Sequence, residues 1–172
     1  MKTKFKNILI AITFLFSAFI AAEGLNKKVY VIPVQDVIDL GIPGLVNRGI
    51  DLAESNNADL IIFDIDTFGG RVDAATQIKD SISSTEIETI AFINRRAISA
   101  GSLISLSCDQ IYMTGGGLIG AATAVDMSGK KGSEKVISFM REEMASTAEQ
   151  RGRNKKIAVS YTHLRAHETH EN

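Results

Sequence analysis

The sequence predicts an α/β protein with a mainly parallel sheet that is covered by helices on both sides. Its 172 residues are 45% hydrophobic, which is enough for one domain with a proper core. Trp is absent and Phe and Tyr are sparse, so this core must be aliphatic, as in proteins whose buried strands are rich in Val, Ile and Leu. Strand and helix patterns also alternate along the chain, which is typical of parallel sheets.

The first half of the chain contains two strand–helix units. Lys28–Val34 (KVYVIPV) is rich in β-branched residues and predicts a strand. Ile42–Ser55 repeats apolar residues at helical spacing, with Pro43 near its start, and predicts a helix. Asp59–Asp66 (DLIIFDID) predicts a second buried strand that ends in two acids, and Val72–Ile82 returns to helical spacing.

The second half repeats this alternation. Thr89–Asn94 (TIAFIN) predicts a third strand, and Ser99–Ser107 is small and apolar, as a buried helix would be. Gln110–Met113 predicts a short fourth strand, and Glu134–Arg151 predicts a long charged amphipathic helix. No internal repeat is strong enough to indicate a solenoid.

The domain is expected to span residues 23–158. In residues 1–22, the lysines at positions 2, 4 and 6 are followed by an apolar run from Ile8 to Ile20 and then by small residues. This pattern is typical of a secretory signal peptide. The apolar run is shorter than the roughly 20 residues of a membrane span, and an uncleaved N-terminal anchor is the alternative. Either way, we expect the body of the protein to be exported to the periplasmic or extracytoplasmic side of the membrane.

The segment 159–172 holds all three histidines of the chain, His163, His167 and His170. Their spacing would place them on one face of a helix, as in a zinc site. However, the string VSYTHLRAHET resembles translated sequencing-adapter read-through. We therefore expect this segment to be a non-native tail, and we expect neither a metal nor a cofactor.

Charge and cysteine content exclude two classes of protein. The formal net charge of -1 leaves no basic surface for nucleic acid, so nucleic acid is not an expected partner. The single cysteine, Cys108, excludes an intramolecular disulfide framework and is expected to be a buried small hydrophobe rather than a reactive thiol.

Three strand-to-helix junctions (64–70, 97–101 and 115–120) could carry chemistry, because such turns expose amides at helix N-termini. The third matches GxGxxG, but loop-like residues follow it, which favours a glycine-rich turn over a dinucleotide site. The first contains the DxD of haloacid-dehalogenase-type phosphohydrolases, but Phe68 stands where those enzymes have threonine. The alternative is that Asp64 and Asp66 are strand-end residues, with Asp66 bonding the amides of the turn.

Taken together, the pair Gly69-Gly70 and the segment Ser99-Ala100-Gly101 favour covalent acyl chemistry. A serine at such a turn has an exposed hydroxyl and a nearby helix N-terminus. Its turn amides and those of a glycine loop can converge on a tetrahedral oxyanion, because glycine lets the backbone approach the substrate. The alternative is that the serine only allows tight packing. The residues expected to support these turns are Asp66, Gly69 and Gly101.

The order and spacing of five segments resemble the N-terminal domain of NfeD proteins, which are membrane-bound, ClpP-class serine proteases. These segments are IPVQDVIDLGIPGLVNRGIDLA, LIIFDIDTFGGRVDAATQIKDSI, AFINRRAISAGSLISLSCDQIYM, GGGLIGAATAV and MASTAEQRGRN. The resemblance covers nearly all of residues 29–158, and the pairing of D-T-x-G-G with A-x-S-A-G is its most specific part. It implies a ClpP/crotonase-like spiral of β-β-α units, a nucleophile at Ser99, and an oxyanion hole formed by the backbone amides of Gly70 and Ala100.

The resemblance also implies cleavage of apolar peptide segments, with stomatin-like membrane proteins as substrates. It further implies homo-oligomers (dimers or larger) and attachment to the membrane through C-terminal helices beyond this chain. The alternatives are a non-catalytic scaffold of the same fold that binds an apolar segment of a membrane partner and, more remotely, acyl-CoA chemistry, which conflicts with export.

The base of such a protease would have to be unusual. No histidine precedes Val159, so the body of the chain cannot form a Ser-His-Asp triad, and a desolvated lysine would be needed. This agrees with the Ser-Lys dyad of some NfeD proteases. The place of their lysine on the long helix is filled here by Ala145, with Arg141 one turn earlier. The candidate substitutes are Lys130, Lys131 and Lys135.

Overall fold

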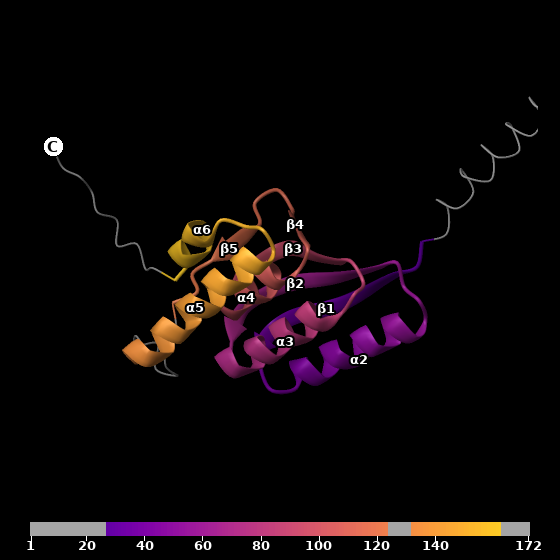
Figure 1. The fold of residues 1–172 in the computed structure, drawn as a ribbon, viewed down its shortest axis with the longest axis horizontal. Helices are drawn as coiled ribbons and strands as arrows, with labels where there is room; N and C mark the ends of the chain where they lie inside the picture. The colour runs from indigo at the N-terminus through magenta and orange to yellow at the C-terminus, as the bar shows by residue number, and fades with distance from the viewer. Residues whose placement is uncertain (1–26, 124–131, 163–172) are drawn as a thin grey trace, which may run out of the picture.

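The computed structural model describes residues 27–123 and 132–162 (Figure 1). In chain order the elements are β1 (Val29–Ile38), α2 (Ile42–Ser55), β2 (Leu60–Gly70), α3 (Val72–Ser84), β3 (Thr89–Ile98), α4 (Ala100–Ser107), β4 (Gln110–Met113), β5 (Leu118–Gly120), α5 (Glu134–Gln150) and α6 (Lys155–Ser160). The predicted signal segment, Lys130, Lys131 and the three histidines lie outside the described residues.

The strands form one five-stranded sheet in which every pair is parallel, which confirms the predicted fold class. The strand order is β1-β2-β3-β4, and β5 also pairs with β3. β4 pairs with Ile90–Ile93 of β3, whereas β5 pairs with Arg96–Ile98 further along the same strand. The segment 115–120, interpreted as a glycine-rich turn, therefore ends in a strand that was not predicted.

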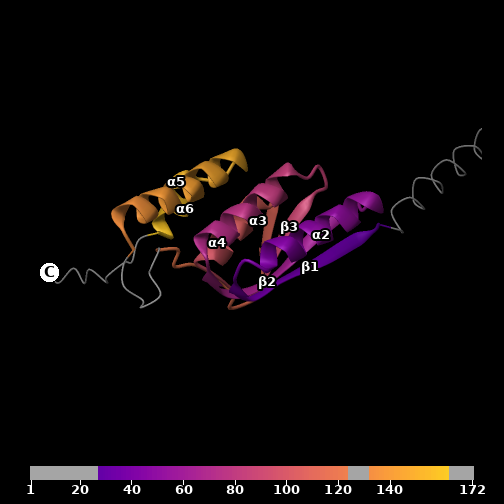
Figure 2. The same ribbon diagram turned by 90° about the horizontal axis from the view of Figure 1, so that it is seen from below.

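Within the described residues, the expectation of helices on both faces of the sheet is wrong. Figures 1 and 2 show α2, α3 and α4 side by side over one face, with α5 packed on α4 and α6 packed on α5. Each new strand from β1 to β4 is added on the same side of the previous one. Right-handed crossovers then place every helix on the same face, since helices cover both faces only where the strand order reverses.

The core lies between the sheet and this helix layer and is aliphatic, as predicted. In β2 the residues Ile61, Phe63 and Ile65 point to the helices and are fully buried. The opposite face of the sheet is apolar too but open, with Val31 61% exposed and Tyr112 54% exposed. These apolar residues on both sides of each strand are the reason why the sequence indicated a sheet covered twice.

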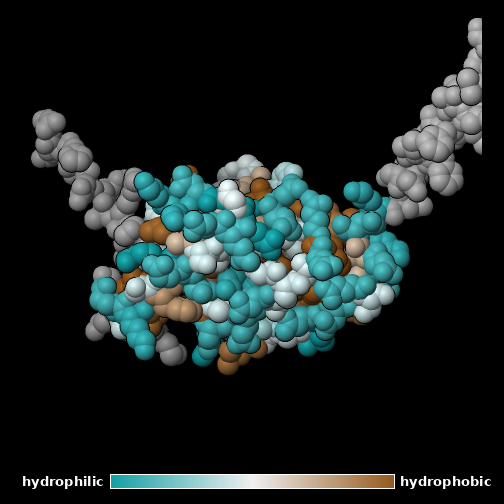
Figure 3. Space-filling model, in the orientation of Figure 1, coloured by the Kyte–Doolittle hydropathy of each residue, from teal (hydrophilic) through white to brown (hydrophobic). Residues whose placement is uncertain are grey.

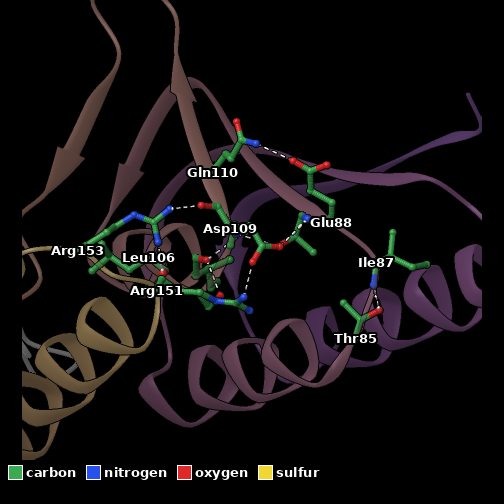
Figure 4. A network of polar contacts seen from close by, with 12 residues as sticks. Thr85, Ile87, Glu88, Leu106, Asp109, Gln110, Arg151 and Arg153 are labelled. Atoms are coloured by element: carbon green, nitrogen blue, oxygen red, sulfur yellow. Dashed lines mark hydrogen bonds and ion pairs between the residues drawn. The ribbon is translucent and has the colours of Figure 1, made fainter. Parts of the chain in front are cut away.

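Two arginines fix the turn between α5 and α6 to the end of α4 (Figure 4). Arg151 Nη1 donates to the carboxylate of Asp109, which also accepts from the amide and hydroxyl of Thr89 at 2.8 and 2.7 Å. Arg153 donates to the carbonyls of Leu106 (3.1 Å) and Asp109 (2.9 Å). Burial alone would raise the pKa of Asp109, but the Thr89 hydrogen bonds and both arginines outweigh it and hold the pKa below its usual value.

Next to this network, Cys108 is fully buried, as expected for a small core residue. Burial raises the pKa of its thiol to about 12. The described chain continues past Ala158 to residue 162. There, the carbonyls of Tyr161 and Thr162 accept hydrogen bonds from the Ala122 amide (2.6 Å) and the Thr123 hydroxyl (2.8 Å).

Candidate functional site

Ser99 occupies the turn between β3 and α4 in a backbone conformation that serine rarely adopts. Its φ is 53° and its ψ is -114°. Such a residue costs on the order of 1–3 kcal/mol and persists only where the surrounding structure imposes it. Although Ser99 is the N-cap of α4, its hydroxyl makes no capping hydrogen bond. Ser99 is half-buried, and among residues 27–123 and 132–162 its hydroxyl has no hydrogen-bond partner.

Hydrogen bonds on both sides impose this conformation. The Ser99 amide donates to the Gly120 carbonyl of β5 at 2.9 Å, and the Ser99 carbonyl accepts from the Ser102 amide at 2.9 Å. The buried Ser102 Oγ lies 2.8 Å from the Ala97 carbonyl oxygen and 2.9 Å from that of Gly120, and it accepts the Gly120 amide at 3.0 Å. The unpredicted strand β5 thus holds the turn in place.

The glycine pair at the end of β2 packs directly against this turn. Gly69 has φ +104°, and a Cβ there would lie 2.6 Å from Ser99 Cβ and 3.2 Å from the Ala100 nitrogen. A Cβ on Gly70 would lie 2.2 Å from the Ile38 carbonyl oxygen of β1. Only glycine fits at these two positions, so the backbone itself borders Ser99.

Ala100 and Gly70 carry the two backbone amides that were expected to form an oxyanion hole. Ala100 is the first residue of α4, so its amide has no acceptor within the helix. The Arg71 amide donates to Ile38 of β1 at 2.8 Å. Gly70 precedes Arg71, and its backbone lies against Ile38 of β1. Gly101 keeps α4 close to β2, because its Cβ would lie 2.6 Å from Thr67 Cγ2.

The structure corrects the role expected for Asp66. Its carboxylate does not bond the turn amides but pairs with Arg96 at 3.2 Å and, more loosely, with Arg95 at 3.9 Å. The Gly69 amide instead donates to Thr67 Oγ1 at 2.9 Å. Successive side chains of β2 point to opposite faces, so buried Thr67 faces the turn while Asp66 lies on the open face.

Lys135, the described candidate base, is exposed at the start of α5. It borders a largely apolar cleft of about 750 Å³ between α3 and α5, visible as a hollow in Figure 3. The other residues that line this cleft are Arg71, Val72, Asp73, Thr76, Val136 and Phe139. Arg71 directly follows Gly70, so the cleft opens beside the glycine loop. Within the described residues, no side chain hydrogen-bonds the Ser99 hydroxyl.

Sequence reasoning did not single out Lys79, the lysine that lies between α3 and α5. Its ammonium pairs with Asp80 at 2.8 Å and with Glu143 of α5 at 3.0 Å. Burial alone would lower the pKa of Lys79, but these hydrogen bonds raise it above its usual value. Lys79 therefore stays protonated and cannot serve as a base as it stands. A pairing between helices so distant in sequence leaves no local signal in the chain.

Residues 28–169 match the family model of the NfeD1b N-terminal domain. The chain belongs to this family. It is 39% identical over 139 residues to the membrane protein NfeD1b of Bacillus subtilis, covering 81% of this chain and 32% of the relative. It is 31% identical over 161 residues to the membrane-bound protease PH1510 of Pyrococcus horikoshii, covering 88% and 36%. The chain thus spans about a third of the length of these relatives.

Solved structures agree with this NfeD1b assignment. A lysine-to-alanine variant of the 1510-N membrane-bound stomatin-specific protease, in complex with a substrate peptide, has a TM-score of 0.74 and 30% identity, covering 80% of this chain and 66% of that one. ClpP1 from Listeria monocytogenes has a TM-score of 0.53 at 20% identity, covering 77% and 78%, and shows the shared fold. The predicted ClpP-like α/β fold is confirmed. No helix among the described residues is long and apolar enough to cross a membrane.

Proposed function

We propose that this NfeD1b-type domain is a serine endopeptidase that cleaves apolar peptide segments of stomatin-like membrane proteins at the extracytoplasmic face of the membrane. The observation that carries the proposal is the backbone of Ser99, whose positive φ presents an uncapped hydroxyl between a helix N-terminus and a glycine loop. A strained strand-to-helix turn of this kind exposes the nucleophile in other serine hydrolases. The relationship to PH1510, named a membrane-bound protease, supports the same activity.

Ser99 Oγ attacks the scissile carbonyl carbon, and its proton passes to a neutral base. The carbonyl oxygen becomes an oxyanion that accepts hydrogen bonds from the amides of Gly70 and Ala100. Collapse of this intermediate breaks the C–N bond, and the protonated base returns the proton to the leaving amine. Water then hydrolyses the acyl-serine ester by the same route. Backbone donors suit this task because glycine lets the backbone approach the substrate closely.

The base is assigned to Lys135, with Lys131 as the second candidate outside the described residues. Lys135 belongs to the same cleft as Arg71, next to Gly70, and a peptide bound there would cover the ammonium. The general base of this reaction is the neutral amine of a lysine. Lys79 is not a competitor, because its two carboxylate partners keep it charged.

The cleft between α3 and α5 also supports the choice of substrate. Val72, Val136 and Phe139 line it, and Phe139 is 46% exposed, so an apolar side chain of the substrate would bury surface there. The structure of 1510-N with a substrate peptide supports a peptide ligand for this chain as well.

The test is labelling of the full chain with a fluorophosphonate probe. The proposal expects a covalent adduct on the wild type and none on Ser99→Ala, as measured by intact mass. Ser84→Ala, at an exposed serine of α3, is the matched serine control and should still be labelled. The Lys135→Ala variant is expected to label at least about tenfold more slowly than the wild type near neutral pH, whereas Lys155→Ala labels normally. Equal labelling of wild type and Ser99→Ala would reject the assignment.

A non-catalytic scaffold is the second candidate, and the place of the family lysine favours it. That place holds Ala145, and within the described residues no basic side chain contacts the Ser99 hydroxyl. A scaffold would bind a synthetic apolar peptide in the cleft without cutting it. Fluorescence anisotropy shows this binding, and mass spectrometry of the same peptide shows whether it is cleaved. Binding of an intact peptide, with no labelling of the wild type, would favour the scaffold.

A further inference from the structure

The ladder between β2 and β3 is interrupted just before the two strands reach the site. Ile65 pairs with Ile93, and the next pair is Thr67 with Ala97. Between these pairs β2 has one residue, Asp66, whereas β3 has the three residues 94–96. Such a bulge removes regular ladder hydrogen bonds where the spacing between neighbouring strands is set.

A side-chain bridge crosses this interruption. Arg96 of β3 donates from Nε to Asp66 Oδ1 of β2 at 3.2 Å. Its guanidinium carbon also lies 4.3 Å from the ring centroid of Phe68. Asp66 and Phe68 are two residues apart on β2, so one arginine binds both residues on one face of the strand. Phe68 is 70% exposed, so its ring is held by this contact rather than by burial.

The bridge lies directly beside the glycine pair of the site. Phe68 precedes Gly69, and glycine has the greatest backbone freedom of all residues. On the buried side, Thr67 fixes the loop by accepting the Gly69 amide. On the open side, the arginine bridge ties the start of this loop to β3, which ends two residues after Arg96 at Ile98, directly before Ser99.

We propose that Arg96 is a positioning residue that bridges Asp66 and Phe68 and so fixes the Gly69–Gly70 loop relative to Ser99. This proposal rests on the proposed function only for its catalytic consequence, which is that the Gly70 amide is held where it can donate to the oxyanion. Preorganised donors lose effect when they are displaced or mobile, so loss of the bridge reduces the rate of the chemical step more than binding.

Hydrogen–deuterium exchange on the full chain tests the positioning itself. Arg96→Ala is expected to speed exchange across residues 66–70 by about tenfold, because the loop opens locally more often. Arg95→Ala is the matched control, since Arg95 is 72% exposed and lies 3.9 Å from Asp66. It is expected to change exchange less than about twofold. Phe68→Leu, which removes the ring without removing the apolar side chain, should resemble Arg96→Ala.

Equal exchange in the Arg96→Ala and Arg95→Ala variants would overturn the proposal, as would faster exchange spread evenly over all strands. Thermal melts identify a variant that fails to fold, and Arg96→Lys is then the substitute, since it keeps the charge beside Asp66 but loses the planar contact with Phe68.

Fluorophosphonate labelling separates this proposal from the proposed function. In a labelled wild type, Arg96→Ala is expected to lower the maximal labelling rate about tenfold with little change in the half-saturating probe concentration, and Arg96→Lys to recover part of it. An unchanged maximal rate would contradict the positioning role. If the wild type is not labelled at all, the proposed function fails, and the exchange comparison still decides the role of Arg96.

Discussion

Replacing Ser99 by glycine removes the backbone strain at the turn, so the Ser99→Gly variant is expected to be more stable than Ser99→Ala. Alanine keeps the β-carbon that makes φ 53° and ψ -114° unfavourable, whereas glycine adopts such angles without strain. The comparison isolates the backbone, because neither variant has the hydroxyl and, in the described part of the chain, this hydroxyl makes no capping hydrogen bond. Ser99→Ala should therefore melt close to the wild type.

The magnitude follows from two opposing contributions. Relief of strain at a residue of this kind stabilises the folded state by on the order of 1–3 kcal/mol. The greater freedom of glycine in the unfolded chain offsets about 0.4–1 kcal/mol of this gain. A net stabilisation of about 1 kcal/mol remains, which corresponds to a rise in melting temperature of about 4 °C for a domain of this size.

Differential scanning calorimetry and urea denaturation of the wild type and both variants measure this difference. Fluorophosphonate labelling of the two variants serves as the control, since neither can form an adduct at residue 99. A Ser99→Gly variant that melts at or below Ser99→Ala would refute the reasoning, because it would mean that the turn imposes no strain on a residue with a β-carbon.

Three further predictions concern the surroundings of the site. Gly70→Ala is expected to lower the free energy of unfolding, measured in urea, by at least about 2 kcal/mol, because the added Cβ would lie 2.2 Å from the Ile38 carbonyl oxygen. Gly115→Ala is the control and should change it by less than about 0.5 kcal/mol, because an added Cβ there would have no atom within 4 Å. The pKa of Asp109 is lower in the folded state than in the unfolded state, so its ionised carboxylate stabilises the fold above about pH 4 and this stabilisation is lost as the pH falls. The melting temperature should therefore drop more between pH 6 and pH 3 in the wild type than in Asp109→Asn. The Cys108 thiol, with a pKa of about 12, should react with Ellman's reagent at pH 8 only after denaturation, and fast reaction of the folded chain would contradict its burial.

The sequence predicts the elements well where the signal is local. The helix over Ile42–Ser55 has the predicted bounds, because Pro43 marks its start and its apolar spacing is regular. The strands β2 and β3 extend beyond their predicted ends, to Gly70 and Ile98, because the bulged ladder continues through residues that look like a turn. Strand β5 has only three residues after three glycines, and its pairing with Arg96–Ile98 is not visible in its own sequence.

The candidate site is predictable in its residue types but not in its geometry. The motifs identify Ser99, Gly70 and Ala100, and the structure places Ser99 and Ala100 in one turn with Gly69, the neighbour of Gly70, packed against it. The strain at Ser99 depends on the hydrogen bond from its amide to Gly120, a contact that no local pattern indicates. The role of Asp66 was mistaken because its two arginine partners become neighbours only through the bulge in β3.

The order of strands in the sheet has a consequence for how the chain folds. From β1 to β4, each strand pairs with the one that precedes it along the chain, as Leu60 of β2 does with Val29 and Thr89 of β3 with Ile61. Contacts between strands that follow one another in the chain can form progressively during synthesis, starting from the N-terminal strands. The Ser99 turn cannot be completed at that stage, because the Ser99 amide donates its hydrogen bond to the carbonyl of Gly120, which is synthesised later. A partly synthesised chain would therefore hold a folded β1–β2–β3 unit before its serine turn is formed, which delays any reactivity until β5 has joined the sheet.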